Sequence, residues 1–219
     1  MSTEWLAELN EPARQVLAAL GRTRRYAPGA PLFLEGDPGG SVIIVQSGRV
    51  KVFATSDTGH HVLLAVRGPG DVLGDLSAID GEPRSATGTA LDTVDAQVIP
   101  AEQFREFLVA VPDAALVLLR VVIHRMRDAD RVRVEFGARD TLGRVAARLV
   151  ELAETHGEAT EDGVKVALPL TQDDLAQWVA ASREAVARAL ASLRRRHLIT
   201  TARRDITIID LDGLRAAAR

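Results

Sequence analysis

A chain of 219 residues without cysteine has no disulfides, no thiol catalysis, no cysteine–zinc site and no cysteine-ligated iron–sulfur cluster. Its net charge of −3 argues against a chain that is basic throughout, and its hydrophobic content of 47% is enough for a buried core. No apolar run reaches the length of a membrane span, and the N-terminus lacks the features of a signal peptide, so we expect a cytoplasmic protein with no membrane contact.

The first hundred residues change from a helical to a strand-like pattern. Residues 4–20 have apolar positions at helical spacing and predict one or two short helices, broken near Pro12. From about residue 24 to 100, short apolar runs such as "SVIIVQSG" alternate with turn signals such as "GDPGG" and "GPGD". This pattern predicts an antiparallel sandwich or barrel, with hairpin connections at "QSGRV" and "SDTGHH". We assign residues 1–111 to this β-barrel domain.

A long helix is predicted from Pro112 to roughly Phe136, followed by a turn around Gly137 and a second helix over 139–157. Apolar residues recur along one side of the long helix, interrupted by Arg133; they are Ala115, Leu119, Val122, Met126, Ala129 and Phe136. Two interpretations are open: a helix that lies on its own domain, or a dimerisation helix over 112–137 that pairs through this seam. The acidic segment 154–163 is interpreted as a solvated loop.

The last domain, 138–219, contains two short helices separated by a tight turn. Thr171 is placed to cap a helix over 172–179 that buries Leu175, Trp178 and Val179. Ser182 is placed to cap a second helix over 183–196, with Val186, Leu190 and Leu193 in the core. The segments "HLIT" and "DITIID" around "TARRD" predict a hairpin, so the whole is typical of a winged helix-turn-helix.

Arginines are concentrated in this motif, with seven arginines and one glutamate between residues 182 and 204. Arg183, Glu184 and Arg188 lie at the N-terminal end of the second helix, which is the end that a recognition helix presents to DNA bases. Other side chains suit phosphate contacts; they are Thr171, Ser182, Arg194, Arg195, Arg196, Arg203 and Arg204. The alternative is a solvated arginine face on an ordinary helical hairpin.

The segment "GDLSAIDGEPRSAT", residues 74–87, combines two turn-forming glycines with an Arg84–Ser85 pair. It could be a surface loop or a loop that closes around an anion, since arginine and turns of backbone amides both favour anions.

Four motifs together resemble the CRP/FNR family of bacterial transcription regulators, and the resemblance covers about residues 24–210. They are "EGDPGGSVIIVQSGRVKVF", "GPGDVLGDLSAIDGEPRSAT", "DTLGRVAARLVELA" and "LTQDDLAQWVAASREAVARAL". The resemblance implies an α+β chain with an N-terminal cyclic-nucleotide-binding β-barrel (jelly-roll), a long dimerisation helix and a C-terminal winged helix-turn-helix. It also implies a homodimer that binds palindromic double-stranded DNA and recruits or blocks RNA polymerase.

The same resemblance assigns roles to individual residues. Arg84 and Ser85 match the pair that holds a cyclic phosphate, Asp75 the acidic residue that holds the ribose, and Gly74 and Leu76 shape the loop. Leu64, Arg125, Ala129 and Asp130 complete the implied pocket. Arg183, Glu184 and Arg188 match the base-reading residues, which implies a TGTGA-like half-site.

The chain departs from the family pattern at three places. Asp75 stands where the family has glutamate, and Ala129–Asp130 replaces a Thr–Ser pair that contacts adenine in the cyclic-AMP-responsive type. Ala180 stands at a turn glycine of the helix-turn-helix, where a left-handed alanine costs about 1 kcal/mol. The first two departures bear on the choice of ligand, and the third does not affect DNA binding.

Several alternatives remain for the effector. Cyclic AMP is the first expectation, and cyclic GMP, a cyclic dinucleotide or activity without ligand are the others. Haem is disfavoured because no histidine lies in the 74–86 cassette. We expect no metal, no covalent cofactor and no catalytic residue, because Ser85 has no histidine near it in sequence to act as a base. A nucleotide-sensing adaptor that does not bind DNA is the alternative of another class.

Overall fold

The computed structural model describes residues 5–57, 59, 61–166, 171–202 and 205–219. Two compact units divide the chain, Met1–Asp128 and Ala129–Arg219. Their boundary falls inside helix α5 (Pro112–Ala138), earlier in the chain than the boundary expected near residue 137. The reason is that α5 takes part in both units: Ala114, Val117, Leu118 and Val121 are buried in the core of the first unit, and Phe136 contacts the second unit's Arg144.

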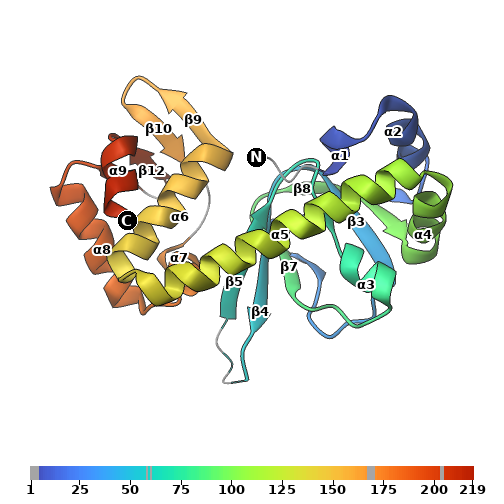
Figure 1. The fold of residues 1–219 in the computed structure, drawn as a ribbon, viewed down its shortest axis with the longest axis horizontal. Helices are drawn as coiled ribbons and strands as arrows, with labels where there is room; N and C mark the ends of the chain where they lie inside the picture. Colours follow the sequence, from blue (N-terminus) through green and yellow to red (C-terminus); the bar gives the residue numbers. More distant parts are fainter. Residues whose placement is uncertain (1–4, 58, 60, 167–170, 203–204) are drawn as a thin grey trace. The chain divides into compact units, whose positions relative to one another are not determined.

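Antiparallel strands build two sheets in the described part of the first unit, with the orders β1-β8-β3-β6 and β2-β7-β4-β5 (Figure 1). The strands are β1 (Arg22–Tyr26), β2 (Pro31–Phe33), β3 (Ser41–Ser47), β4 (Val50–Thr55), β5 (His61–Arg67), β6 (Val72–Leu73), β7 (Thr87–Ala90) and β8 (Val94–Pro100). Ile43, Val50 and Ala90 share one buried cluster, to which both sheets contribute. The predicted sandwich is confirmed, in a jelly-roll form rather than as a closed barrel.

One predicted hairpin is wrong. β3 and β4 flank "QSGRV" but lie in different sheets, so this segment is a crossover between the sheets. Gly48 makes the crossover possible, because its φ is +77° and an added Cβ would lie 2.2 Å from the Thr93 carbonyl oxygen. The other predicted hairpin is confirmed, since β4 and β5, on either side of "SDTGHH", pair antiparallel.

Short helices close one end of the first unit, where α1 (Trp5–Glu8), α2 (Glu11–Ala18) and α4 (Ala101–Ala110) gather beside the start of α5 (Figure 1). Trp5 is fully buried there, with its ring edge-to-face on Phe104 at 5.6 Å, and its indole nitrogen donates to the Ala114 carbonyl oxygen. The predicted break between the first helices lies at residues 9–10, where Asn10 caps α2. Pro12 lies in the first turn of α2, where a backbone N–H has no hydrogen-bond partner within the helix, so proline is tolerated there.

The predicted long helix is confirmed as α5, which extends to Ala138 and therefore includes Gly137. The expected turn at Gly137 is wrong by two residues, because the chain turns at Arg139 and Asp140 instead. No single helix among the described residues is long and apolar enough to cross a membrane; α4 and α5 reach that length and composition only as a pair bent by 113°.

The second unit contains α6 (Thr141–His156), the helix-turn-helix and a sheet of order β11-β12-β10-β9. Its other elements are β9 (Gly157–Thr160), β10 (Gly163–Val166), α7 (Gln172–Trp178), α8 (Arg183–Arg195), β11 (Ile199–Ala202), β12 (Asp205–Ile208) and α9 (Leu211–Ala217). β11 and β12 form the predicted wing hairpin. The acidic segment 154–163 is exposed but is not a loop throughout, since it ends α6 and forms β9.

Candidate effector and DNA-binding sites

Residues 74–87 form a short helix and a loop. Gly74 has a φ of +73° and precedes helix α3 (Asp75–Asp80), and Gly81 ends that helix with a φ of +78°. An added Cβ on Gly74 would lie 1.9 Å from the Nη1 atom of Arg84, so only glycine fits beside this arginine. The two ends of the predicted cassette are therefore held together by its own arginine.

Arg84 is buried, with 5% of its surface exposed. Its Nη1 donates to the Gly74 carbonyl oxygen at 2.9 Å, its Nη2 donates to the Ser41 carbonyl oxygen, and its guanidinium lies over the Phe33 ring. Burial lowers the pKa of Arg84, and Asp75 and Asp37 oppose this effect. Arginine nevertheless stays charged in proteins. Its buried Nε has no hydrogen-bond partner among the described residues, so this site can accept an anion.

Asp75 is also buried, and its carboxylate pairs with Arg125 of α5 at 3.1 Å. Arg125 in turn donates from Nη2 to the Val72 carbonyl oxygen at 2.8 Å, and its Nε is another buried donor without a partner among the described residues. The structure thus brings together Gly74, Asp75, Arg84 and Arg125. A ribose hydroxyl that donates to Asp75 therefore binds a carboxylate that is already paired with Arg125.

Sequence reasoning missed several residues of this site. One of them is Arg67, at the end of β5. Burial lowers its pKa, the nearby cation of Arg125 lowers it further, and the carboxylates of Asp71 and Asp75 oppose both effects. Ser41 and Phe33 contact Arg84 from other strands. Gly39 allows close approach, because an added Cβ would lie 2.4 Å from the Cβ of Ser77 on α3. Of these contacts, only the close approach at Gly39, which lies in the turn motif "DPGG", had a signal in the sequence.

The other residues of the predicted pocket are more exposed or lie in the second unit. Leu64 on β5 and Leu76 on α3 are about half exposed, and Ser85 is exposed. Ala129 and Asp130 belong to the second unit, where Asp130 pairs with Arg133 at 3.0 Å.

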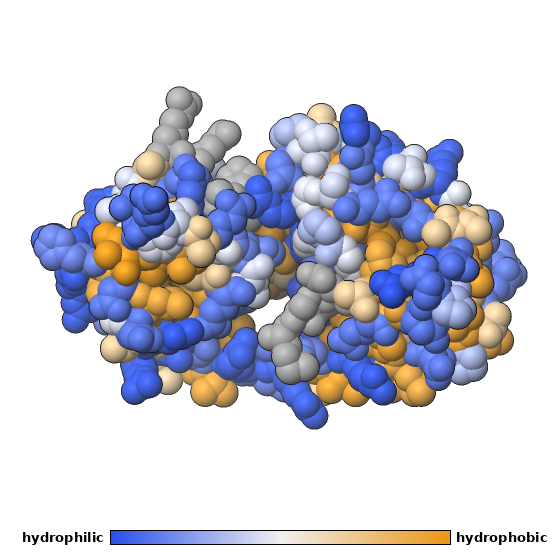
Figure 2. Space-filling model, turned by 90° about the horizontal axis from the view of Figure 1, so that it is seen from above, coloured by the Kyte–Doolittle hydropathy of each residue, from blue (hydrophilic) through white to orange (hydrophobic). Residues whose placement is uncertain are grey.

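The predicted dimer seam on α5 is largely exposed in the single chain. Leu119 and Met126 are 53% and 59% exposed, Ala129 is exposed, and Val122 is half-buried. Figure 2 shows apolar areas between hydrophilic ones on the face in view, and Val109 and Val134, outside the seam, are 82% and 71% exposed, so exposure alone does not single out the seam. Phe136 differs from the other seam residues because Arg144 lies over its ring at 5.2 Å.

The helix-turn-helix follows the predicted local rules. The Thr171 hydroxyl accepts the Asp174 amide, and the Asp174 carboxylate accepts the Thr171 amide, which together form a capping box at the start of α7. Ser182 caps α8 by accepting the Ala185 amide at 3.2 Å. The predicted core residues of both helices are buried, namely Leu175, Trp178, Val179, Val186, Leu190 and Leu193.

Ala180 has a φ of +46°, so the left-handed residue anticipated at this turn is present. We expect Ala180→Gly to raise the free energy of unfolding of the DNA-binding unit by up to about 1 kcal/mol, because glycine adopts this conformation without a steric penalty. Chemical denaturation followed by tryptophan fluorescence measures this change, with DNA affinity as the control that stays constant. A decrease in stability would show that the turn is not strained.

The N-terminal end of α8 presents charged side chains to solvent. Arg183, Glu184 and Arg188 are exposed, and Arg183 lies 3.5 Å from Asp173 at the start of α7. A backbone hydrogen bond and the Ser182 hydroxyl lower the pKa of Glu184, and the two arginines add to the effect. Glu184 is therefore ionised at neutral pH and only accepts hydrogen bonds, as a contact to a cytosine amino group requires.

The predicted phosphate contacts are distributed over α7, α8 and the wing. Arg194 and Arg195 are exposed at the end of α8, and Arg194 donates to the Thr201 hydroxyl on β11 at 2.9 Å. Thr171 and Ser182 are exposed residues whose hydroxyls already cap helices. Arg203 and Arg204, predicted as further phosphate contacts, lie outside the described residues.

Matches to two domain families define the class, a DNA-binding transcription regulator with a nucleotide-binding domain. Residues 23–110 match the cyclic nucleotide-binding domain, and residues 143–217 match the Crp-like helix-turn-helix domain. A CRP-like cAMP-activated global transcriptional regulator of Mycobacterium tuberculosis is 34% identical over 194 residues, 89% of this chain and 87% of that protein. The chain belongs to the CRP/FNR family of transcription regulators, as its motifs indicated. This is a family of regulators and not of enzymes.

Solved structures support the fold assignment. FixK2 from Bradyrhizobium japonicum is similar with a TM-score of 0.80 at 20% identity, over 91% of this chain and 98% of that one. A CRP-family transcriptional regulator from Thermus thermophilus is similar with a TM-score of 0.76 at 25% identity, over 89% of this chain and 96% of that one.

Proposed function

We propose that the protein is a cytoplasmic homodimer that binds a palindromic operator and that a cyclic nucleotide at residues 74–86 controls this binding. The observation that carries the proposal is Arg84, a buried cation in a glycine-turned loop with one donor, Nε, left without a partner among the described residues. A phosphate that accepts from this donor satisfies a group that otherwise costs free energy. Ser85, exposed next to Arg84, is available to the same phosphate.

Cyclic AMP is the first choice of effector, supported by the name of the Mycobacterium tuberculosis relative, which is described as cAMP-activated. Asp75 is the acceptor for the ribose, and Leu64 and Leu76 offer apolar surface to the base. The departures at Asp75 and Ala129–Asp130 keep cyclic GMP, a cyclic dinucleotide and activity without ligand as alternatives, because Asp130 accepts from the exocyclic amine of either purine.

DNA recognition is assigned to α8 and its surroundings. Arg183 and Arg188 contact guanine bases and Glu184 contacts cytosine in a TGTGA-like half-site, whereas the arginines at the end of α8 and on the wing contact phosphates. We infer that two copies pair through Leu119, Val122, Met126 and Ala129 of α5. Binding both half-sites then requires the two α8 helices to lie about 34 Å apart, one turn of DNA. The ligand acts by binding the DNA-competent state more tightly, and the bound dimer recruits or blocks RNA polymerase.

The test is a panel of nucleotides combined with a DNA-binding measurement. Calorimetry with cyclic AMP, cyclic GMP and a cyclic dinucleotide identifies the ligand, and fluorescence anisotropy with a TGTGA-type palindrome measures its effect. We expect the effector to tighten DNA binding by about tenfold or more. If the protein binds DNA tightly and no nucleotide changes its affinity, it is a regulator that is active without ligand. If it does not bind DNA under any condition, it is the nucleotide-sensing adaptor.

A further inference from the structure

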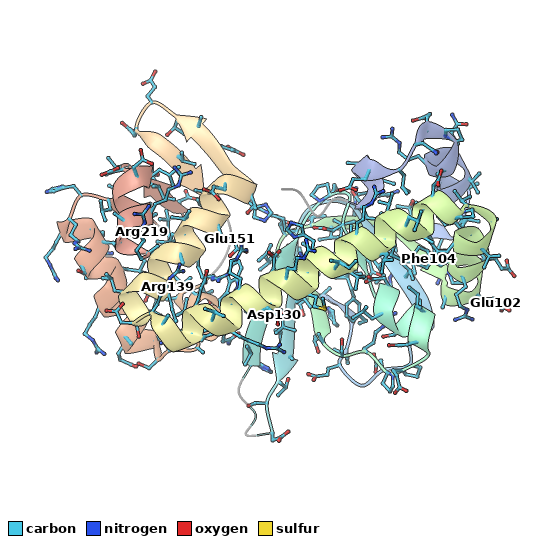
Figure 3. All side chains as sticks on the ribbon, viewed as in Figure 1. Glu102, Phe104, Asp130, Arg139, Glu151 and Arg219 are labelled. Carbon is cyan, nitrogen blue, oxygen red and sulfur yellow. The ribbon has the colours of Figure 1, made fainter. Side chains whose placement is uncertain are left out.

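The corner between α5 and α6 contains a network of partly buried charges within the second unit. Glu135 near the end of α5 pairs with Arg139 at 3.1 Å and with Arg148 of α6 at 2.7 Å, and Arg148 also pairs with Glu151 (Figure 3 labels Arg139 and Glu151). The side chains of Arg148 and Glu135 are only 8% and 15% exposed. Neither residue belongs to the effector site or to the DNA-contacting set.

The same corner reaches the turn of the helix-turn-helix. A small hollow is lined by residues of three elements: Val132, Glu135 and Phe136 of α5, Arg144 and Arg148 of α6, and Trp178 and Val179 at the end of α7. Val179 directly precedes the left-handed Ala180, and the turn that begins there leads to the cap of α8. The end of α5, the start of α6 and the helix-turn-helix turn therefore meet around the Glu135–Arg148 pair.

A charge pair in this position fixes geometry more than it adds stability. Buried ion pairs contribute little net free energy, because desolvation offsets the attraction, but loss of one partner leaves an uncompensated charge. Arg148 forms bonds on two sides, to α5 through Glu135 and to its own helix through Glu151. The end of α5 is thereby attached to the DNA-binding unit in one orientation, consistent with a unit boundary that lies before Ala129.

We propose that Glu135 and Arg148 are positioning residues for DNA recognition: they hold the helix-turn-helix in a fixed orientation on the end of the long helix. The inference rests on the proposed function, in which paired α5 helices set the distance between the two α8 helices. Neither residue touches DNA. Their effect appears only when two half-sites have to be bound at once, since that requires the correct spacing.

The experiment compares wild type with Glu135→Gln in the full chain, on a palindrome and on DNA with a single half-site. We expect the variant to bind the palindrome about tenfold more weakly, and the half-site within a factor of about two. A third DNA, a palindrome with one base pair inserted between its half-sites, tests the spacing. We expect wild type to bind it more weakly than the normal palindrome, and Glu135→Gln to bind the two DNAs equally. Glu135→Asp keeps the charge and should recover part of the lost affinity.

Glu154→Gln is the matched control, because Glu154 forms a comparable pair with Arg215 at 2.8 Å in the same unit but is about half exposed. This variant should bind both DNAs as wild type does. If Glu135→Gln fails to fold by circular dichroism, Arg148→Lys takes its place, because lysine keeps the charge but loses the fork that bonds Glu135 and Glu151 at once. This variant should shift palindrome affinity in the same direction.

Equal losses on palindrome and half-site, or no loss on either, would overturn the inference. If the proposed function itself is wrong, the wild-type protein already shows it. It is then monomeric by light scattering, or it does not bind the palindrome, before any variant is compared.

Discussion

Replacing Arg183 and Arg188 together with alanine is expected to weaken binding to a TGTGA-type palindrome by at least about a thousandfold, since each well-formed arginine–guanine contact contributes about 1–3 kcal/mol and a dimer makes the contacts twice. Both side chains are exposed at the N-terminal end of α8, and neither is needed for the core, which contains Val186, Leu190 and Leu193 instead. The double variant should therefore fold normally. Fluorescence anisotropy with labelled operator and with random DNA measures the effect.

The matched comparison is Arg194→Ala, because Arg194 lies on the same helix and is assigned to a DNA phosphate contact. It should weaken binding to operator and to random DNA by similar factors and reduce the salt dependence, because phosphate contacts carry no sequence information. The double variant should instead lose the preference for operator over random DNA. If it keeps that preference, α8 does not read bases through these arginines, and the arginine-rich helix is a general phosphate surface.

The helix-turn-helix could be predicted closely because its determinants are local in sequence. Thr171 with Asp174 and Ser182 with the Ala185 amide are contacts over three residues, and the buried positions follow helical spacing. The long helix was predictable for the same reason. Its end was missed by two residues, because the stop is set by the Asp140 cap of the next helix and not by Gly137.

Contacts between residues far apart in sequence could not be predicted in this way. The crossover at Gly48 depends on which sheet β4 joins, and the pairing of β4 with β5 and β7 is decided by the whole sandwich. Likewise, the sequence marked Arg84 as an anion ligand but not as a support for its own loop. That role depends on the Ser41 carbonyl oxygen and the Phe33 ring, which the fold brings to Arg84 from 43 and 51 residues earlier in the chain.

This double role of Arg84 determines the second large effect. Arg84→Ala removes the cation and leaves the Ser41 carbonyl oxygen without the arginine as its donor, whereas the Gly74 carbonyl oxygen keeps the Ala78 amide. We expect this to cost about 1–3 kcal/mol of unfolding free energy for the first unit. We expect calorimetry to detect no binding of the effector, and operator affinity to stop responding to it. Thermal denaturation with and without nucleotide gives an independent readout, since a bound ligand raises the stability of wild type and should not raise that of the variant.

Two further variants separate loss of the ligand contact from loss of the loop. Arg84→Lys keeps the charge but loses the planar fork with which arginine reaches separate acceptors, so it should bind the effector at least about tenfold more weakly, with a smaller loss of stability. Arg25→Ala, which removes an exposed arginine paired with Asp95 in the same unit, should respond to the effector as wild type does. A full response in Arg84→Ala would mean that the anion is held elsewhere. Arg125, whose Nε is also buried without a partner among the described residues, would then be the group to test, because it already lies against Asp75.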